Sequence, residues 1–186
     1  MGLKNLFFTV AIFSSVFTTI CLSQLRVHND AVYYCDPLMC YSGKPFTGIS
    51  YRENKPDRDW SASFANSSAG LDEFIFEDGI QIGKISYYHG NGKKKEESVL
   101  GLLPNSSLMS VLSKTYYWYN GNKQNEAKWE HNDIHSSRIL KNYRSWYYNG
   151  QLKLMYVHFN DGDILKQCWD ENGNKIENCD ITHLPK

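Results

Sequence analysis

Two histidines four residues apart are the first side chains in this sequence that suggest chemistry. His131 and His135 would share one face of a helix, as the two zinc ligands of many peptidases do, but no glutamate follows the first histidine as it does in those enzymes. The residues around them, Asn132-Asp133 and Ser136-Ser137, are typical of a loop. We therefore expect no metal site at these histidines.

Other catalytic and ligand-binding patterns are absent from the sequence or incomplete in it. Neither the Gly-x-Ser-x-Gly elbow of hydrolases nor a phosphate-binding loop occurs. The run Asp170-Glu171-Asn172-Gly173-Asn174 carries acidic and amide side chains, as calcium loops do. Its glycine is fourth instead of sixth, however, and no glutamate stands at the twelfth position. The chain is accordingly predicted to be no enzyme and to use no cofactor.

Cysteine chemistry is better represented. Beyond the N-terminal segment the chain has four cysteines: Cys35, Cys40, Cys168 and Cys179. An even number of cysteines in an exported protein predicts disulfides, here two, with three possible connectivities. Local pairing is favoured for the last two, which flank a predicted hairpin at residues 170–174. A turn at Gly173-Asn174 would place them directly opposite, whereas a turn at Asn172-Gly173 would offset them diagonally. A four-cysteine zinc site would normally show paired two-residue spacings, which are missing.

The N-terminal segment has the features of a secretory signal peptide. Lys4 is followed by a run without charge from Asn5 to Leu25, and small residues return near the expected cleavage point before Gln24. Residues 1–23 are therefore predicted to be removed on export to the periplasm, the cell surface or the medium. An uncleaved membrane anchor is the alternative, because the run is just long enough to span a bilayer. A lipid anchor on Cys21 fits poorly, since small residues do not precede it.

Charge and composition limit the class of partner. The whole chain has equal numbers of basic and acidic side chains, and removal of residues 1–23 takes away only Lys4 among them, so the mature chain stays close to neutral. Near-neutrality argues against nucleic-acid binding, which normally needs a basic face. The one basic cluster, Lys93-Lys94-Lys95, is followed at once by Glu96-Glu97 and is typical of a solvated strand. Aromatic residues make up 15% of the chain and favour strands over helices.

A repeated phrase indicates how these strands are organised. Aromatic residues run into a turn whose glycines, Gly92, Gly121 and Gly150, are evenly spaced along the chain (121 − 92 = 150 − 121). Asn-Gly after a strand predicts a type I′ hairpin turn, since both residues tolerate positive φ. The sequence thus predicts an all-β, elongated, twisted antiparallel meander of successive β-hairpins. Residues 24–41 form a lead-in, and residues 42–186 form the hairpin-repeat domain.

Overlaying the units at this glycine spacing predicts two faces. Positions 88, 117 and 146, together with 90, 119 and 148, form the column that we expect to be packed, because strand residues two apart share a face. The opposite face is aromatic too, and it supplies the candidate partner-binding residues: Tyr87, His89, Tyr116, Trp118 and Tyr147. A packing role for both stripes is the alternative interpretation.

The chain resembles the MORN-repeat variant found in exported bacterial proteins, including antitoxin-like components of toxin–antitoxin systems. The resemblance rests on the phrase at residues 43–48, on Tyr-Tyr-x-x-Asn-Gly at residues 87–92 and 116–121, and on the phrase at residues 169–176. It implies a fold of successive β-hairpins and a non-catalytic role, usually in binding a protein. The interval between the turn glycines exceeds the usual two-strand unit, so we expect inserted strands or loops.

Two functions remain open from the sequence. The first is a secreted, immunity-like module that sequesters a protein partner through a sheet face or an open sheet edge. The alternative is a module that binds carbohydrate or the cell-envelope surface and uses the same aromatic side chains as stacking platforms. No membrane span is expected after signal cleavage.

Overall fold

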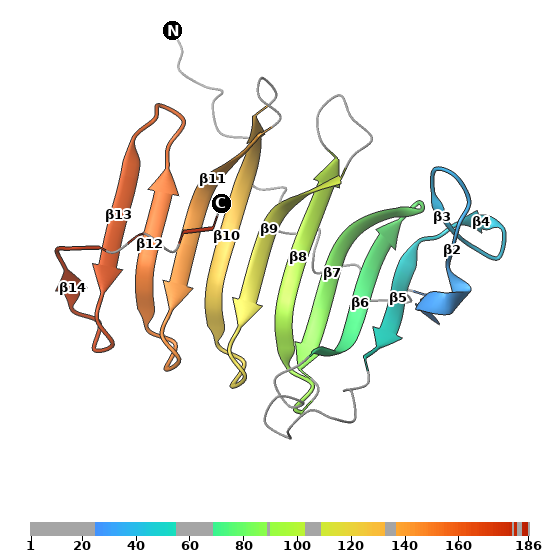
Figure 1. Ribbon diagram of the computed structural model, residues 1–186, viewed down its shortest axis with the longest axis horizontal. Coiled ribbons are helices and arrows are strands. Elements are labelled where there is room, and N and C mark those ends of the chain that lie inside the picture. Colours follow the sequence, from blue (N-terminus) through green and yellow to red (C-terminus); the bar gives the residue numbers. More distant parts are fainter. Residues whose placement is uncertain are drawn as a thin grey trace, which may run out of the picture.

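A computed structural model describes residues 25–54, 69–88, 90–102, 109–132, 137–179, 181 and 184–185. The predicted all-β meander is confirmed: eleven strands form one sheet in which each strand from β5 to β14 pairs antiparallel with the next along the chain (Figure 1). The sheet contains β5 (Gly48–Glu53), β6 (Ala69–Glu77), β7 (Ile80–Tyr88), β8 (Lys94–Leu102), β9 (Met109–Tyr117), β10 (Lys123–Asn132), β11 (Ser137–Trp146), β12 (Leu152–His158), β13 (Ile164–Trp169) and β14 (Lys175–Ile176).

The first strand departs from the expected antiparallel order. β1 (Arg26–His28) lies beside β5 and runs parallel to it, with Arg26 opposite Ile49. A short 3-10 helix, η1 (Asn29–Ala31), then leads into a separate three-stranded sheet of β2 (Tyr33–Tyr34), β3 (Met39–Tyr41) and β4 (Lys44–Pro45). Both outer strands of the large sheet, β1 and β14, are short, which limits the pairing that either edge offers to another chain.

The regular interval between the turn glycines corresponds to two long strands, and the expectation of inserted strands is wrong. Between Gly92 and Gly121 lie β8 and β9, and between Gly121 and Gly150 lie β10 and β11, each of nine or ten residues. Two strands return the chain to the same edge of the sheet. The turns β7–β8, β9–β10, β11–β12 and β13–β14 therefore lie in a row along one edge (Figure 1), which we call the turn edge.

The Asn-Gly turns are not of type I′. In the turn between β9 and β10 only Gly121 has positive φ, and the N–H of Gly121 donates to the carbonyl of Trp118. This is the three-residue hairpin in which a type I turn ends in a left-handed glycine. Positive φ at two successive residues, as type I′ requires, occurs at Asp78-Gly79 and Ser42-Gly43, which join strands through two-residue loops.

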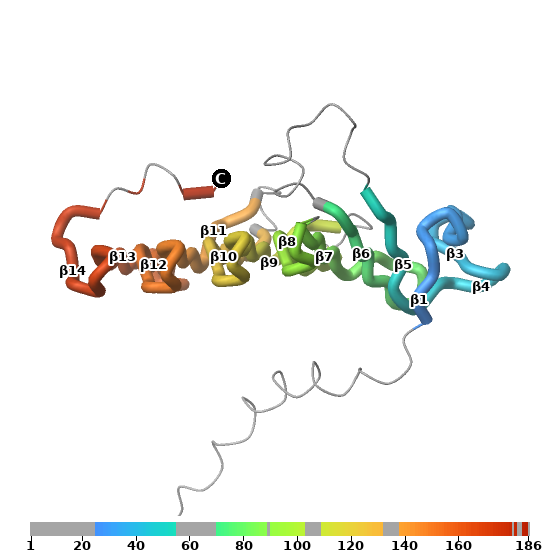
Figure 2. The backbone as a smooth tube through the Cα atoms, turned by 90° about the horizontal axis from the view of Figure 1, so that it is seen from below, coloured from blue at the N-terminus to red at the C-terminus, as the bar shows by residue number. Residues whose placement is uncertain are grey.

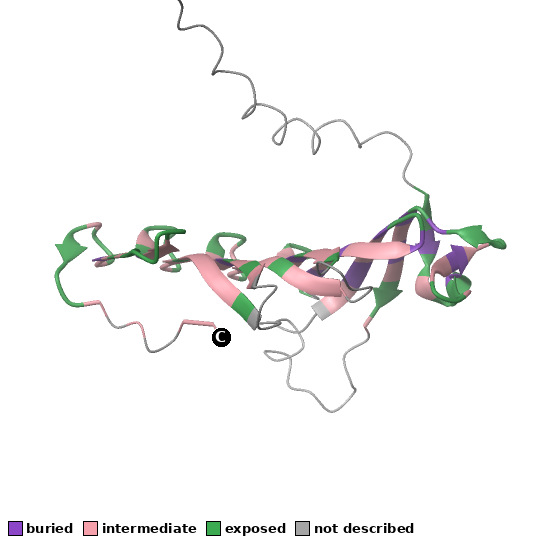
Figure 3. Ribbon diagram, turned by 90° about the horizontal axis from the view of Figure 1, so that it is seen from above, coloured by how far each residue is buried: buried purple, intermediate pink, exposed green. Residues whose placement is uncertain are grey.

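Most of the sheet is a single layer, and its hydrophobic core is small. Figure 2 shows the strands edge-on as one thin, twisted layer, and Figure 3 shows the buried residues concentrated at the end that carries β1 and the small sheet. The core cluster there consists of Val27, Val32, Phe46 and Phe76. Farther along, strands are tied by ion pairs between neighbours, such as Lys114 with Glu96 at 3.0 Å.

The expected two disulfides are present, Cys35 with Cys40 and Cys168 with Cys179, and the local pairing that the sequence favours for the last two cysteines is confirmed. The expected cross-strand geometry is wrong for the second pair, because Cys168 lies opposite Ile176 and Cys179 follows the end of β14. Two such bonds are in keeping with an oxidising compartment. The predicted signal peptide lies outside the described residues. Among the residues that the structure describes, no helix has the length and hydrophobicity that a membrane span needs.

Candidate binding surface

Strand register divides the candidate residues between two faces. We call the face that carries Tyr116 face A and the opposite one face B. Tyr116 lies opposite Glu96 on β8 and Asn125 on β10, and Glu96 in turn lies opposite Ser86. Because Tyr87 follows Ser86 in the same strand, it projects from face B. The prediction that Tyr87 and Tyr116 share a face is therefore wrong.

A one-residue difference between turns explains this outcome. The N–H of Tyr88 donates to the carbonyl of Lys93, five residues on, whereas that of Trp118 donates to Asn122, four residues on. The first turn thus has one residue more. Tyr88 holds the same position before its turn as Trp118 and Tyr147 hold before theirs, although the interval from Tyr88 to Trp118 is one residue longer than the interval from Trp118 to Tyr147. His89, the other candidate, lies outside the described residues.

The three equivalent aromatic residues form a ladder along the turn edge. The hydroxyl of Tyr88 donates to the backbone carbonyl of Tyr117 at 2.6 Å. The indole N–H of Trp118 donates to the backbone carbonyl of Trp146 at 3.3 Å. The hydroxyl of Tyr147 donates to the backbone carbonyl of Trp169 at 3.0 Å. Each side chain therefore reaches one hairpin further along. The candidates Trp118 and Tyr147 thus have a structural role, whatever else they contact.

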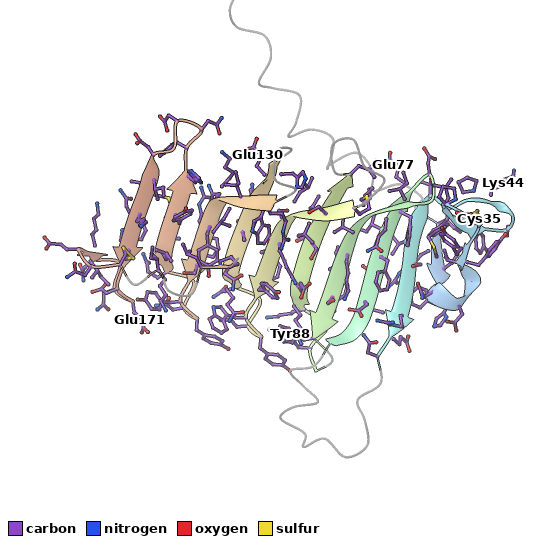
Figure 4. The ribbon with its side chains drawn as sticks, turned by 45° about the horizontal axis from the view of Figure 1, so that its top comes forward. Cys35, Lys44, Glu77, Tyr88, Glu130 and Glu171 are labelled. Carbon is purple, nitrogen blue, oxygen red and sulfur yellow. A yellow bond between two sulfur atoms is a disulfide. The ribbon has the colours of Figure 1, made fainter. Side chains whose placement is uncertain are left out.

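Turn asparagines make a second ladder beside the first. The side-chain amides of Asn91, Asn120 and Asn149 donate to the carbonyls of Tyr119, Tyr148 and Glu171 in the next turn, at 2.7, 2.8 and 3.2 Å. Figure 4 places Tyr88 and Glu171 on this turn edge, with Glu77 and Glu130 at the opposite edge. Two hydrogen bonds per step fix each turn against its neighbour, which makes the turn edge rigid.

The most exposed aromatic rings of the turn edge belong to Tyr119 and Tyr148, with 38% and 56% of their surface accessible. Each packs edge-on against a ladder ring: Tyr119 against Tyr88, with centroids 5.2 Å apart, and Tyr148 against Trp118 at 5.8 Å. The prediction that positions 119 and 148 belong to the packed column is therefore wrong. Sequence reasoning missed them as surface residues because it treated the strand alternation as continuing into the turn.

Acidic side chains on both faces are tied to neighbouring strands. On face B, the hydroxyls of Tyr87 and Tyr117 donate to Glu73 and Glu97 at 2.8 and 2.9 Å. Burial, reinforced by the bond to the carboxylate, raises the pKa of both phenols. Both phenols therefore stay protonated at neutral pH and donate to the carboxylates, so these pairs join neighbouring strands. A phenol with a raised pKa is a poor general base.

Asp72 is the most enclosed charged side chain on face A, at 4% exposed. Its carboxylate accepts hydrogen bonds from Ser86, Asn54 and Arg52, and Lys84 lies 3.4 Å away. Burial acts to raise the pKa of Asp72, but these donors and the lysine charge outweigh it and hold the pKa below its ordinary value. The group stays ionised at neutral pH and joins β5, β6 and β7.

The histidine pair does not form a described site. His131 lies on β10 opposite Arg138, and its Nδ1 atom is buried without a hydrogen-bond partner, as is the indole nitrogen of the nearby Trp129. His135 lies outside the described residues. Within the described part of the chain, no three His, Cys, Asp or Glu side chains gather where they could hold a metal ion.

Comparison of the chain with protein-family models, with curated proteins and with solved structures gave no match. The resemblance to MORN-repeat proteins therefore stays a prediction from the sequence phrases, and the fold rests on the structure alone.

Proposed function

We propose that this is a secreted, non-catalytic binding protein that engages a protein partner through the aromatic turn edge. The observation that carries the proposal is the exposure of Tyr119 and Tyr148 on a rigid base: each ring packs on a ladder ring whose own polar atom is bound to the next hairpin. Aromatic anchors held in place before binding lose little conformational entropy on association, and tyrosine and tryptophan are enriched among residues that dominate interfaces.

The immunity-like form of this proposal, in which the partner is a toxin, is supported by the MORN resemblance. Export is supported by the signal-like N-terminal sequence and by the two disulfides.

Affinity capture with paired variants tests the proposal. The full chain is used as bait for envelope and secreted fractions of the native host, and the binding of the enriched protein is then measured with purified components. Tyr119→Ala/Tyr148→Ala is expected to weaken binding at least about 30-fold, the effect of losing one anchor of about 2 kcal/mol. Tyr34→Ala is the matched control, because Tyr34 is 66% exposed but lies on the small sheet.

Binding by the double variant within threefold of the parent, with an unchanged circular dichroism spectrum, would remove the turn edge from consideration. A partner that is toxic when expressed alone, and harmless when co-expressed with this chain, would support the immunity-like form. A partner that is not toxic would support the binding proposal and would contradict its immunity-like form.

Carbohydrate binding is the second candidate, and it is favoured by the regular placement of the exposed rings. Tyr119 and Tyr148 occupy turns two strands apart along the edge, a separation of roughly 9.5 Å. Two rings at a fixed separation of this size can stack on alternate sugars of one extended polysaccharide. Titration with cell-wall and plant polysaccharides should then change the tryptophan fluorescence of the parent and not that of Tyr119→Ala/Tyr148→Ala.

A further inference from the structure

A row of aromatic rings crosses face B, close to the turn edge. Ser145 and Cys168 belong to face A, because the strand register joins both of them to Tyr116. The tryptophan that follows each of them therefore projects from face B, as does Tyr117, which follows Tyr116. We call the rings that share this position the ring row, with one on each strand that leads into a turn of the turn edge: Tyr87 on β7, Tyr117 on β9, Trp146 on β11 and Trp169 on β13.

The rings of this row are evenly spaced and half-buried. Each lies two strands from the next, a separation of roughly 9.5 Å. The hydroxyls of Tyr87 and Tyr117 both donate to a glutamate of the preceding strand, which tilts the two rings in the same direction. The ring row therefore presents a regular series of flat aromatic groups to solvent.

The part of face B beside Trp146 has a net positive charge. The ammonium group of Lys123 lies 5.5 Å from the centre of the Trp146 ring and pairs with Glu126 at 2.9 Å. Lys128 lies 3.6 Å from the same carboxylate, and Arg144 lies opposite it on β11. Burial acts to raise the pKa of Glu126, but the bond to Lys123 and the three positive charges outweigh it and hold the pKa below its ordinary value. Three cations thus surround one carboxylate, and the exposed Arg144 can attract an anionic ligand.

Among the residues that the structure describes, no element lies over the ring row. Figure 2 shows β7 to β13 as a single layer, with the described residues near the end of the chain on one side of it. That side is face A, because Leu184 lines one hollow together with Ser145 and Leu154. The described part of the chain therefore leaves the ring row open to a ligand that lies across the strands.

The spacing of the rings and the charge beside them match an extended, acidic polysaccharide. The C–H groups on the flat side of a sugar are attracted to the negative face of an aromatic ring. In an extended chain of β-1,4-linked sugars, alternate sugars turn the same side outward, so that one ring serves every second sugar. Carboxylates on those sugars would pair with exposed cations such as Arg144 and Lys175, which lies opposite Trp169.

We propose that the ring row binds a linear polysaccharide of β-1,4-linked, carboxylate-bearing sugars, which lies across the strands on face B. Alternate sugars stack on successive rings, and the carboxylates of the polysaccharide pair with Arg144 and Lys175. This is a second binding activity, because it requires neither a protein partner nor the exposed rings of Tyr119 and Tyr148.

Calorimetric titration of the full chain, with disulfides intact, tests the proposal with defined oligosaccharides. The acidic probe is the hexasaccharide of β-1,4-linked mannuronate, and cellohexaose is its neutral counterpart with the same linkage. The mannuronate hexasaccharide should bind at least about tenfold more tightly than the disaccharide, because it reaches more than one ring. It should also bind about fivefold more tightly than cellohexaose at low salt, and this difference should shrink as the salt concentration rises.

Two variants separate stacking from charge. Trp146→Leu/Trp169→Leu should weaken binding of both hexasaccharides at least about tenfold with an unchanged circular dichroism spectrum, since Leu152 already stands opposite Trp146. Arg144→Gln should weaken only mannuronate binding, by about threefold. Lys166→Gln is its matched control, because it removes the same charge from an exposed position on face A and should behave as the parent.

Four results would overturn the proposal. They are no mannuronate binding by the parent up to several millimolar, equal binding by the parent and Trp146→Leu/Trp169→Leu, equal affinity for the two hexasaccharides, and tighter binding of single-stranded oligothymidylate than of mannuronate. Tyr119→Ala/Tyr148→Ala should bind mannuronate as the parent does, and a loss in this variant alone would assign the sugar to the turn edge and also contradict the ring row. Each of these results leaves the protein-binding proposal standing, since its test measures a captured protein.

Discussion

Replacing Asp72 with asparagine tests how a sheet with so small a core is held together. The two carboxylate oxygens divide the donors: Ser86 and Lys84 approach Oδ1, and Arg52 and Asn54 approach Oδ2. An amide of the same shape has one acceptor and one donor, so one pair of donors must then face an N–H group. The substitution removes the charge and creates a donor–donor contact without changing the volume.

The expected loss of stability is about 2–3 kcal/mol at pH 7. Hydrogen bonds to a charged group contribute about 1.5–3 kcal/mol net, and a buried donor left unpaired costs about 1–3 kcal/mol. The loss of stability stays below the sum of the two upper limits, because the side chains of Arg52 and Lys84 are 53% and 33% exposed and remain partly hydrated when the carboxylate is lost. Ser86, at 4% exposed, has no such outlet.

The contribution of Asp72 to the free energy of unfolding should decrease as the pH falls. The pKa of Asp72 in the folded protein lies below that of the unfolded chain, about 3.9. The ionised carboxylate makes its full contribution to the free energy of unfolding above about pH 5. The contribution decreases as the pH falls through the folded-state pKa, because the unfolded chain takes up the proton first. The difference between parent and Asp72→Asn should therefore be largest near neutrality and smaller at pH 3.

Urea unfolding at pH 7 and pH 3, followed by circular dichroism, measures both quantities. Glu130→Gln is the control, because Glu130 is 61% exposed beside Lys141 and its loss should cost under about 0.5 kcal/mol. A cost below about 1 kcal/mol for Asp72→Asn at pH 7 would refute the assignment of Asp72 as a tie between three strands. A cost that is the same at pH 3 would refute the part assigned to its charge.

Two further substitutions test the turn edge and the N-terminal end. Trp118→Phe keeps a ring against Tyr148 but removes the bond to Trp146, and should cost about 0.5–1.5 kcal/mol in urea unfolding; unchanged stability would mean that the ladder bond contributes nothing. Gly48→Ala should cost clearly more than Gly162→Ala in thermal unfolding. Both have positive φ, but a Cβ on Gly48 would strike the carbonyl oxygen of Leu25 whereas one on Gly162 meets nothing within 4 Å; equal costs would contradict this account.

The sequence predicts the strands and the turns because both depend on local preferences. Aromatic residues favour extended backbone, and Gly92, Gly121 and Gly150 each take the positive φ that ends a strand. Counting residues between those glycines was also sufficient to predict neighbouring units, since two strands bring the chain back to one edge. The local pairing of Cys168 with Cys179 followed from the same short-range reasoning.

The face from which each side chain projects could not be predicted in the same way, because it depends on register across strands. The two-face prediction overlaid the units at a constant glycine spacing, and the one additional residue in the turn between β7 and β8 puts Tyr87 out of phase with Tyr116. The parallel pairing of β1 with β5 joins segments that are well separated in the sequence and has no local signal.

The turn edge shows why exposure alone is a poor guide to function in a single-layer sheet. With so little core, side chains on the surface also hold the strands, so an alanine at Trp118 or Tyr147 would weaken the fold and any interface together. Tyr119 and Tyr148 differ, because their rings pack onto the ladder from outside and are the more exposed partners of their pairs. Substituting them removes the proposed binding surface while the hydrogen bonds between turns remain, since those bonds use the backbone carbonyls of Tyr119 and Tyr148. A loss of binding at these two positions can therefore be attributed to the interface itself, as a loss at Trp118 could not.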